Sequence, residues 1–170
     1  YGADLLFGPE QMIRRFVKDP SFDQLICVAI AKHSDFKLEG IEDERTLLHA
    51  RLIRDADKLD NCRVKLEESM ETLLDMDEKT VGASPISPKV WESCKAEKSV
   101  LSADRKTGMD YWMSYLALYF DINFLETYQI IKEQDYIRRI AERVPYSRED
   151  TKEKVAYTVK KLEEKMNIQP

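Results

Sequence analysis

The sequence has 170 residues, a length that favours a single domain. Hydrophobic residues make up 43% and charged residues 35%, which is typical of a folded protein with a charged surface and excludes a disordered chain. The net charge is −5 and basic residues are scattered among acids, so we expect no DNA or RNA partner. No apolar run approaches the ~20 residues of a membrane span, so we expect no membrane partner.

Helical patterns follow one another along the first half of the chain. The pattern over residues 1–7 starts without an N-cap residue, which suggests that further residues precede it in the natural protein. Ser21 is the expected N-cap of a third helix. We expect helices over 1–7, 9–18, 21–33 and 45–66, the last extending towards 74, with a connecting loop over 34–42.

The helix over 45–66 is apolar on two opposite sides, a pattern typical of an interior helix. One side carries Leu48, Leu52, Leu59 and Leu66; the other carries Ala50, Ile53 and Val64. Asp57 falls in the middle of the second stripe, where a carboxylate is costly to bury without partners. It is therefore either a satisfied structural carboxylate or a ligand. Asp55 faces the leucine side, and we expect it to be paired or capping.

The second half of the chain is also helical. Residues 75–88 are expected to form a flexible loop, and helices are expected over 88–101, 109–131, 134–143 and 148–166. Aromatic residues over 111–128 are expected to pack a core rather than to stack on a base. Asp121 or Asn123 marks a bend there, and Asp121 caps a helix or pairs with a cation. No strand pattern or repeat is evident, so the predicted fold class is all-α.

A compact polar set surrounds Asp57 on the central helix. Arg54, Asp60 and Asn61 fall on the same side of the helix, with Lys58 at the margin. A carboxylate, a bidentate cation, a point charge and an amide together suit an oxyanion held near a metal ion. The alternative is an ordinary ion pair between Arg54 and Asp57 at i, i+3.

The string IRDADKLDN at residues 53–61 resembles the last motif of the HD superfamily of metal-dependent phosphohydrolases. The string AIAKH at 29–33 resembles the helix that precedes this motif, and residues 110–117 and 120–124 resemble the C-terminal part of uncharacterised bacterial HD-domain proteins. The resemblance implies an all-α HD-like bundle in which Asp57 is a ligand of a divalent metal (Mn, Fe, Co, Ni, Zn or Mg). It also implies contacts to a phosphorylated substrate from His33, Arg54, Lys58 and Asn61.

The chain departs from this family pattern in one respect. Its two histidines, His33 and His49, precede Ser34 and Ala50, so the His-Asp pair that names the superfamily is missing. We expect the chain to be the C-terminal part of an HD domain whose other ligands lie upstream, inactive alone. The competing hypothesis is a catalytically degenerate helical module for regulation or protein interaction. His33 also has a plain interpretation as a helix-terminal residue, and His49 is expected to be structural.

The expected organisation is one HD-like domain over 1–170, with a metal-site core at 1–74 and a C-terminal helical subdomain at 89–170. The implied activity is hydrolysis of a nucleotide or another small phosphate ester, with no catalytic residue assigned. Cys27, Cys62 and Cys94 lie too far apart for a CxxC motif, so reduced thiols in a cytoplasmic protein are expected. A homo-oligomer is compatible with the sequence.

Overall fold

The computed structural model describes residues 1–168, and this part of the chain contains helices and no strand. The prediction of an all-α fold is confirmed. The α-helices are α1 (Gly2–Phe7), α2 (Asp23–Lys32), α3 (Glu44–Glu67), α4 (Met70–Leu74), α5 (Glu78–Ala83), α6 (Pro88–Lys95), α7 (Gly108–Ala117), α8 (Leu125–Glu133), α9 (Tyr136–Glu142) and α10 (Glu149–Ile168). Single 3₁₀ turns are η1 (Met12–Arg15), η2 (Pro20–Phe22), η3 (Ser102–Asp104) and η4 (Leu118–Asp121).

Contacts within the chain separate two compact units, Tyr1–Asp57 and Lys58–Pro170, and the boundary falls inside α3. The predicted subdivision at 74 and 88 differs from this boundary and stays a prediction. None of the helices within residues 1–168 combines the length and the apolar character needed to cross a membrane.

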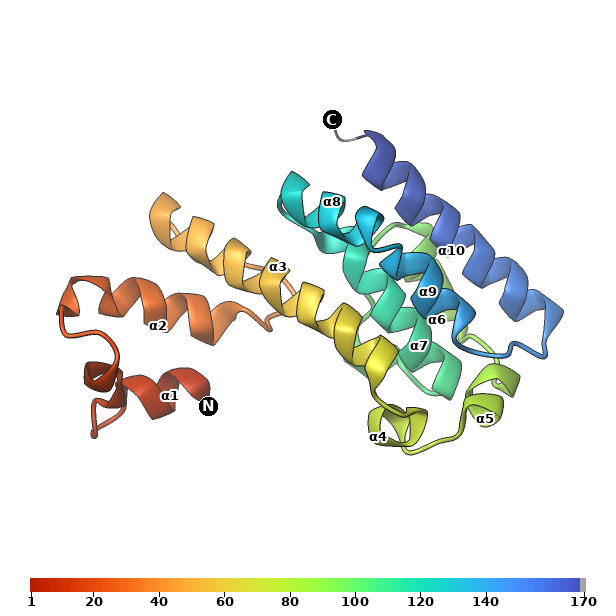
Figure 1. Cartoon of the computed structure of the whole chain (residues 1–170), viewed down its shortest axis with the longest axis horizontal. Coiled ribbons are helices and arrows are strands. Elements are labelled where there is room, and N and C mark those ends of the chain that lie inside the picture. The colour runs from red at the N-terminus through yellow and green to blue at the C-terminus, as the bar shows by residue number, and fades with distance from the viewer. Residues whose placement is uncertain (169–170) are drawn as a thin grey trace. The chain divides into compact units, whose positions relative to one another are not determined.

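The first unit is built from α1, η1, η2, α2 and the beginning of α3 (Figure 1). Helix α1 packs on α2 and on η1. The buried apolar residues of this unit are few and mostly small, namely Ala3, Ile13, Ala29 and Ala50. Several large apolar side chains remain exposed, among them Phe16, Leu48 and Leu52. This unit therefore has a thin core.

Two local predictions in the first unit are wrong. The predicted helix over 9–18 is only the turn η1, which follows a left-handed residue at Gln11 and ends before Asp19-Pro20. Ser21 does not cap α2. Instead, the Asp19 side chain accepts a hydrogen bond from the Ser21 amide at 2.9 Å and caps η2, and α2 then continues without a side-chain cap.

The second unit is organised around α7, which α5, α6, η4, α9 and α10 contact (Figure 1). Trp112, Met113 and Leu116 of α7 are completely buried, and the aromatic segment forms core as predicted. Leu59 and Leu66, from the end of α3, pack against the same core. The predicted bend is also present, because η4 ends at Asp121 and α8 begins only at Leu125.

The buried carboxylate of Asp110 joins the starts of α6 and α7. Its Oδ1 accepts from the Ser87 amide at 2.7 Å, and its Oδ2 accepts from the Ser87 hydroxyl at 2.6 Å. Oδ2 also accepts from the amides of Lys106 and Thr107 at 2.8 and 3.1 Å. Thr107 and Asp110 form a capping box at the start of α7. The sequence contained this capping pattern, but we did not predict it.

The region 67–88 is more helical than expected. Helix α3 ends at Glu67, and Ser69 caps a separate α4 through the Thr72 amide at 3.1 Å. The predicted loop over 75–88 contains α5, so the loop assignment is wrong. Within α5, Gly82 lets the chain pass close to Pro145, because a Cβ at position 82 would lie 2.3 Å from the Pro145 carbonyl oxygen.

Candidate functional site

Helix α3 carries four of the five residues that the sequence singled out. Its start is fixed by Asp43, whose Oδ2 accepts from the amide and the hydroxyl of Thr46 at 2.7 and 2.6 Å. Arg54 and Asp57 belong to the first unit together with His33, which lies at the C-terminal end of α2. Lys58 and Asn61 belong to the second unit.

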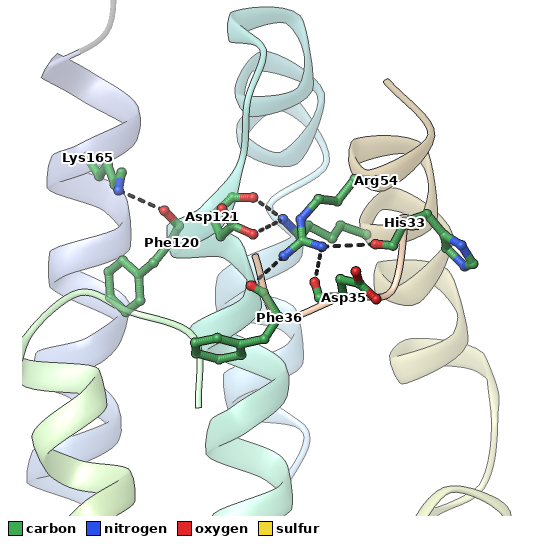
Figure 2. Close-up of polar contacts among 8 residues, drawn as sticks. His33, Asp35, Phe36, Arg54, Phe120, Asp121 and Lys165 are labelled. Atoms are coloured by element: carbon green, nitrogen blue, oxygen red, sulfur yellow. Dashed lines mark hydrogen bonds and ion pairs between the residues drawn. The ribbon is translucent and has the colours of Figure 1, made fainter. Parts of the chain in front are cut away.

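The Arg54 side chain binds the turn that follows α2. Nη1 donates to the carbonyl of His33 at 3.0 Å and to the carbonyl of Asp35, while Nη2 donates to the carbonyl of Phe36 at 3.0 Å (Figure 2). The residue is 7% exposed. The guanidinium therefore satisfies carbonyls at and beyond a helix end, which have no partner within the helix. These acceptors are backbone atoms, so no pattern of residue types in the sequence could predict them.

The imidazole of His33 is held by its own helix. Nδ1 lies 2.7 Å from the carbonyl oxygen of Ile30. A carbonyl only accepts hydrogen bonds, so the neutral ring carries its proton on Nδ1 and has the lone pair on Nε2. Of the predicted residues, the structure brings His33 and Arg54 together through the His33 backbone.

The expected burial of Asp57 is wrong. Asp55 is 1% exposed, whereas Asp57 is exposed. On the leucine side of the first half of α3, Leu48 and Leu52 are exposed, at 52% and 53%, although Asp55 on the same side is buried. The helical wheel showed two apolar stripes but not which of their residues would be covered, because that depends on neighbouring elements.

Asp57 interrupts a line of covered side chains. Ala50, Arg54 and Asn61 point to the same side of α3 as Asp57, and they are buried or half-buried. Asp57 is the most exposed residue of this line, and Asn61 is partly exposed. An accessible carboxylate can bind a cation. The ligand role of Asp57 stays a prediction.

Lys58 is 4% exposed and pairs with Asp121. Its Nζ lies 2.9 Å from Oδ2 of Asp121 and also donates to the Asp121 backbone carbonyl. The prediction that Asp121 pairs with a cation is confirmed. Nearby, Nζ of Lys165 donates to the carbonyl of Phe120 at 2.8 Å (Figure 2). Lys58 therefore stabilises the end of η4, and a substrate phosphate would have to compete with Asp121 for it.

The residues in the described part of the chain do not form a complete metal site. No group of three or more His, Cys, Asp or Glu side chains within it could hold a metal ion. A divalent transition metal needs four to six donors. Asp57 alone therefore does not fit the metal that the HD resemblance implies, and no reaction step through a metal can be derived from this chain.

Two hollows lie elsewhere, in the second unit. One of about 450 Å³ lies between α9 and α10, with an apolar floor that includes Val144, Val155 and Val159. A smaller one of about 280 Å³ lies beside it, against α8. None of the five predicted site residues lines either hollow.

The chain matches no protein-family model, and no curated protein or solved structure matches it. The resemblance to the HD superfamily therefore rests on the motif residues alone.

Proposed function

We propose that this chain is part of an HD-type, metal-dependent phosphohydrolase that acts on a nucleotide or another small phosphate ester. The observation that carries the proposal is the exposed carboxylate of Asp57 in an otherwise covered line of α3. This carboxylate lies in the segment 53–61, which resembles the family's metal-binding motif.

In this proposal Asp57 is one ligand of a divalent metal such as Mn, Fe, Co, Ni, Zn or Mg. We propose that further ligands come from upstream residues, since residues 1–168 hold no group of three or more His, Cys, Asp or Glu side chains that could bind a metal. When bound, the metal would supply Lewis acidity to the phosphate ester. His33 offers Nε2 as a hydrogen-bond acceptor to the substrate.

The proposal gives a different role to each of the remaining candidate residues, Asn61, Lys58 and Arg54. Asn61 is half-buried on the same side of α3 as Asp57. Lys58 binds phosphate in this proposal only after releasing Asp121. The contacts of Arg54 with three backbone carbonyls favour a positioning role over a direct phosphate contact.

The three free cysteines support a cytoplasmic location, where thiols stay reduced.

A second candidate function is a helical regulatory or protein-interaction module that does no catalysis. The buried, engaged state of Arg54 and Lys58 favours it, since both cations already serve the fold. Exposed apolar residues of the first unit, such as Leu48 and Leu52, are also compatible with a protein partner.

The test is a phosphohydrolase screen of the full-length natural protein with Mn²⁺, Co²⁺, Ni²⁺ and Mg²⁺ against a panel of nucleotides. We expect metal-dependent turnover that Asp57→Ala lowers at least a hundredfold with no loss of helix content. Glu67→Ala is the matched control, because Glu67 lies on the same helix, outside this polar set, and pairs with Arg63 at the surface. Unchanged turnover in a folded Asp57→Ala variant would refute the ligand assignment.

The same screen of the full-length protein also distinguishes the non-catalytic module from the phosphohydrolase. No turnover with any metal, together with no His-Asp pair in the natural sequence upstream of Tyr1, would favour the non-catalytic module. We further expect that residues 1–170 alone retain no stoichiometric metal after dialysis. Tightly held metal in that sample would contradict the incomplete ligand set.

A further inference from the structure

The end of α2 is held by a side chain from another helix. The last carbonyls of an α-helix have no partner within the helix and carry the negative end of its dipole. Arg54 of α3 reaches them: its guanidinium donates to His33 O and Phe36 O, each at 3.0 Å, and to Asp35 O. One cation therefore fixes a turn of four residues through three hydrogen bonds.

The geometry of this contact requires an arginine. The guanidinium is a planar fork with five N–H donors, whereas a lysine ammonium is a single point that cannot span the same three carbonyls. Arg54 is almost fully buried. A smaller neutral residue would leave these carbonyls without their guanidinium donor.

The same turn carries His33. Its backbone is bound by Arg54 through the carbonyl, and its ring is bound by the Ile30 carbonyl through Nδ1 at 2.7 Å. Figure 2 shows the ring pointing away from the guanidinium, so Arg54 contacts the backbone of His33 and not its imidazole. The Ile30 carbonyl therefore holds the ring, and Arg54 holds the backbone that carries it.

We propose that Arg54 is a positioning residue that, by fixing the turn after α2, holds His33 as the Nδ1–H tautomer and presents Nε2 to a hydroxyl donor of the ligand. The proposal deepens the proposed function and rests on it only for the identity of the ligand as a phosphate ester. The neutral acceptor nitrogen suits a sugar hydroxyl or a protonated phosphate oxygen. In this account Arg54 itself does not touch the substrate.

The first test measures the tautomer directly. Long-range ¹H–¹⁵N NMR of the imidazole rings is recorded at about pH 8.5, where imidazoles are neutral. The chain has two histidines, so a His49→Gln variant assigns the His33 signals. We expect Nδ1 to show the shift of a protonated nitrogen and Nε2 that of an unprotonated one. A proton on Nε2 of wild-type His33 would overturn the proposal.

The second test links the tautomer to Arg54. We expect Arg54→Gln to shift the His33 ring towards a mixture of tautomers, and Arg54→Lys to restore the Nδ1–H form only in part. Arg51→Gln is the control, because Arg51 lies on the exposed side of the same helix and should leave the His33 signals unchanged. A folded Arg54→Gln variant with an unchanged His33 tautomer would also overturn the proposal.

If the full-length protein shows turnover, a third readout follows. Arg54→Gln and His33→Gln should each lower kcat about tenfold or more, in the range seen when a residue that orients a functional histidine is removed. The double variant should lose no more than the His33 variant alone, since Arg54 acts through His33. Additive losses would assign Arg54 to the substrate instead. The NMR tests do not depend on turnover, so failure of the proposed function leaves them valid.

Discussion

Nζ of Lys58 lies 2.9 Å from Oδ2 of Asp121 and ties α3 to the end of η4. The two residues differ in environment: Lys58 is buried, whereas the Asp121 side chain is 42% exposed. Lys58 also donates to the backbone carbonyl of Asp121, and Lys165 of α10 donates to the carbonyl of Phe120. Two lysines from separate helices thus bind the last carbonyls of the α7–η4 segment, where a cation is favoured by the helix dipole.

We expect Lys58→Met to destabilise the protein more than Asp121→Asn does. The lysine variant loses both the carboxylate and the carbonyl contact, while the exposed Asp121 carboxylate can return to water. A double-mutant cycle on the free energy of unfolding, measured in urea, should give a Lys58–Asp121 coupling of about 1 kcal/mol. A coupling near zero would mean that the ion pair contributes nothing and that Lys58 acts through the carbonyl alone.

Asp110 should be the most sensitive carboxylate in the second unit. It is fully buried and accepts four hydrogen bonds, from Ser87, Lys106 and Thr107. Asp110→Asn turns one acceptor oxygen into a donor that faces other donors. We expect a loss of about 3 kcal/mol in the free energy of unfolding.

The control for Asp110→Asn is Asp104→Asn. Asp104 pairs at 3.2 Å with Lys89, whose side chain is largely in solvent. Such a surface pair contributes about 0.5 kcal/mol. Equal losses in the two variants, measured by urea denaturation, would contradict the central role of Asp110.

Most of the fold was predictable because helix periodicity is a local property of the sequence. Gly8-Pro9, the polar residues around Asp121 and the apolar face of α10 marked ends and faces that the structure confirms. The helix α5 was not predictable in the same way. Its residues look like a loop, and the close approach of Gly82 to Pro145, distant in sequence, accompanies its formation.

The candidate site was predictable only as a segment. The residue types of 53–61 indicated polar chemistry on α3, but the wheel wrongly placed Asp57 on a buried stripe. Both stripes of α3 were apolar, and long-range packing decided which residues of each stripe were covered. The acceptors of Arg54 are three backbone carbonyls, whose positions depend on the turn after α2 rather than on any side chain.

The three thiols should react at very different rates. Burial raises the pKa of Cys62 to about 11 and that of Cys94 to about 12. Since the thiolate is the reactive form, both should be inert to Ellman's reagent at pH 8 in the folded protein. Cys27 is only half-buried and should supply the single fast reaction.

A Cys27→Ser variant should abolish that fast phase, and denaturant should release two further thiols. If the folded variant still reacts rapidly, either Cys62 or Cys94 is more accessible than the structure indicates.

Protonation of the aspartates that cap helices should lower the stability of the protein at acid pH. Hydrogen bonds from the hydroxyl and amide of Thr46 hold the pKa of Asp43 below its ordinary value of 3.8, and the amide and side chain of Thr80 do the same for Asp77. Because the pKa values are lower in the folded protein than in the unfolded chain, this contribution is complete above pH 3.8. It is lost as the pH falls through the lower, folded pKa values.

Asparagine keeps the capping acceptor but does not titrate in this range. We therefore expect Asp43→Asn, and more so the Asp43→Asn/Asp77→Asn double variant, to flatten the dependence of Tm on pH below about pH 4. The measurement is thermal unfolding followed by circular dichroism from pH 7 to pH 2.5. At pH 7 the variants should be slightly less stable than wild type, because the charged cap also favours the positive end of the helix dipole. Parallel curves for wild type and variants across the acid range would show that other carboxylates control acid unfolding.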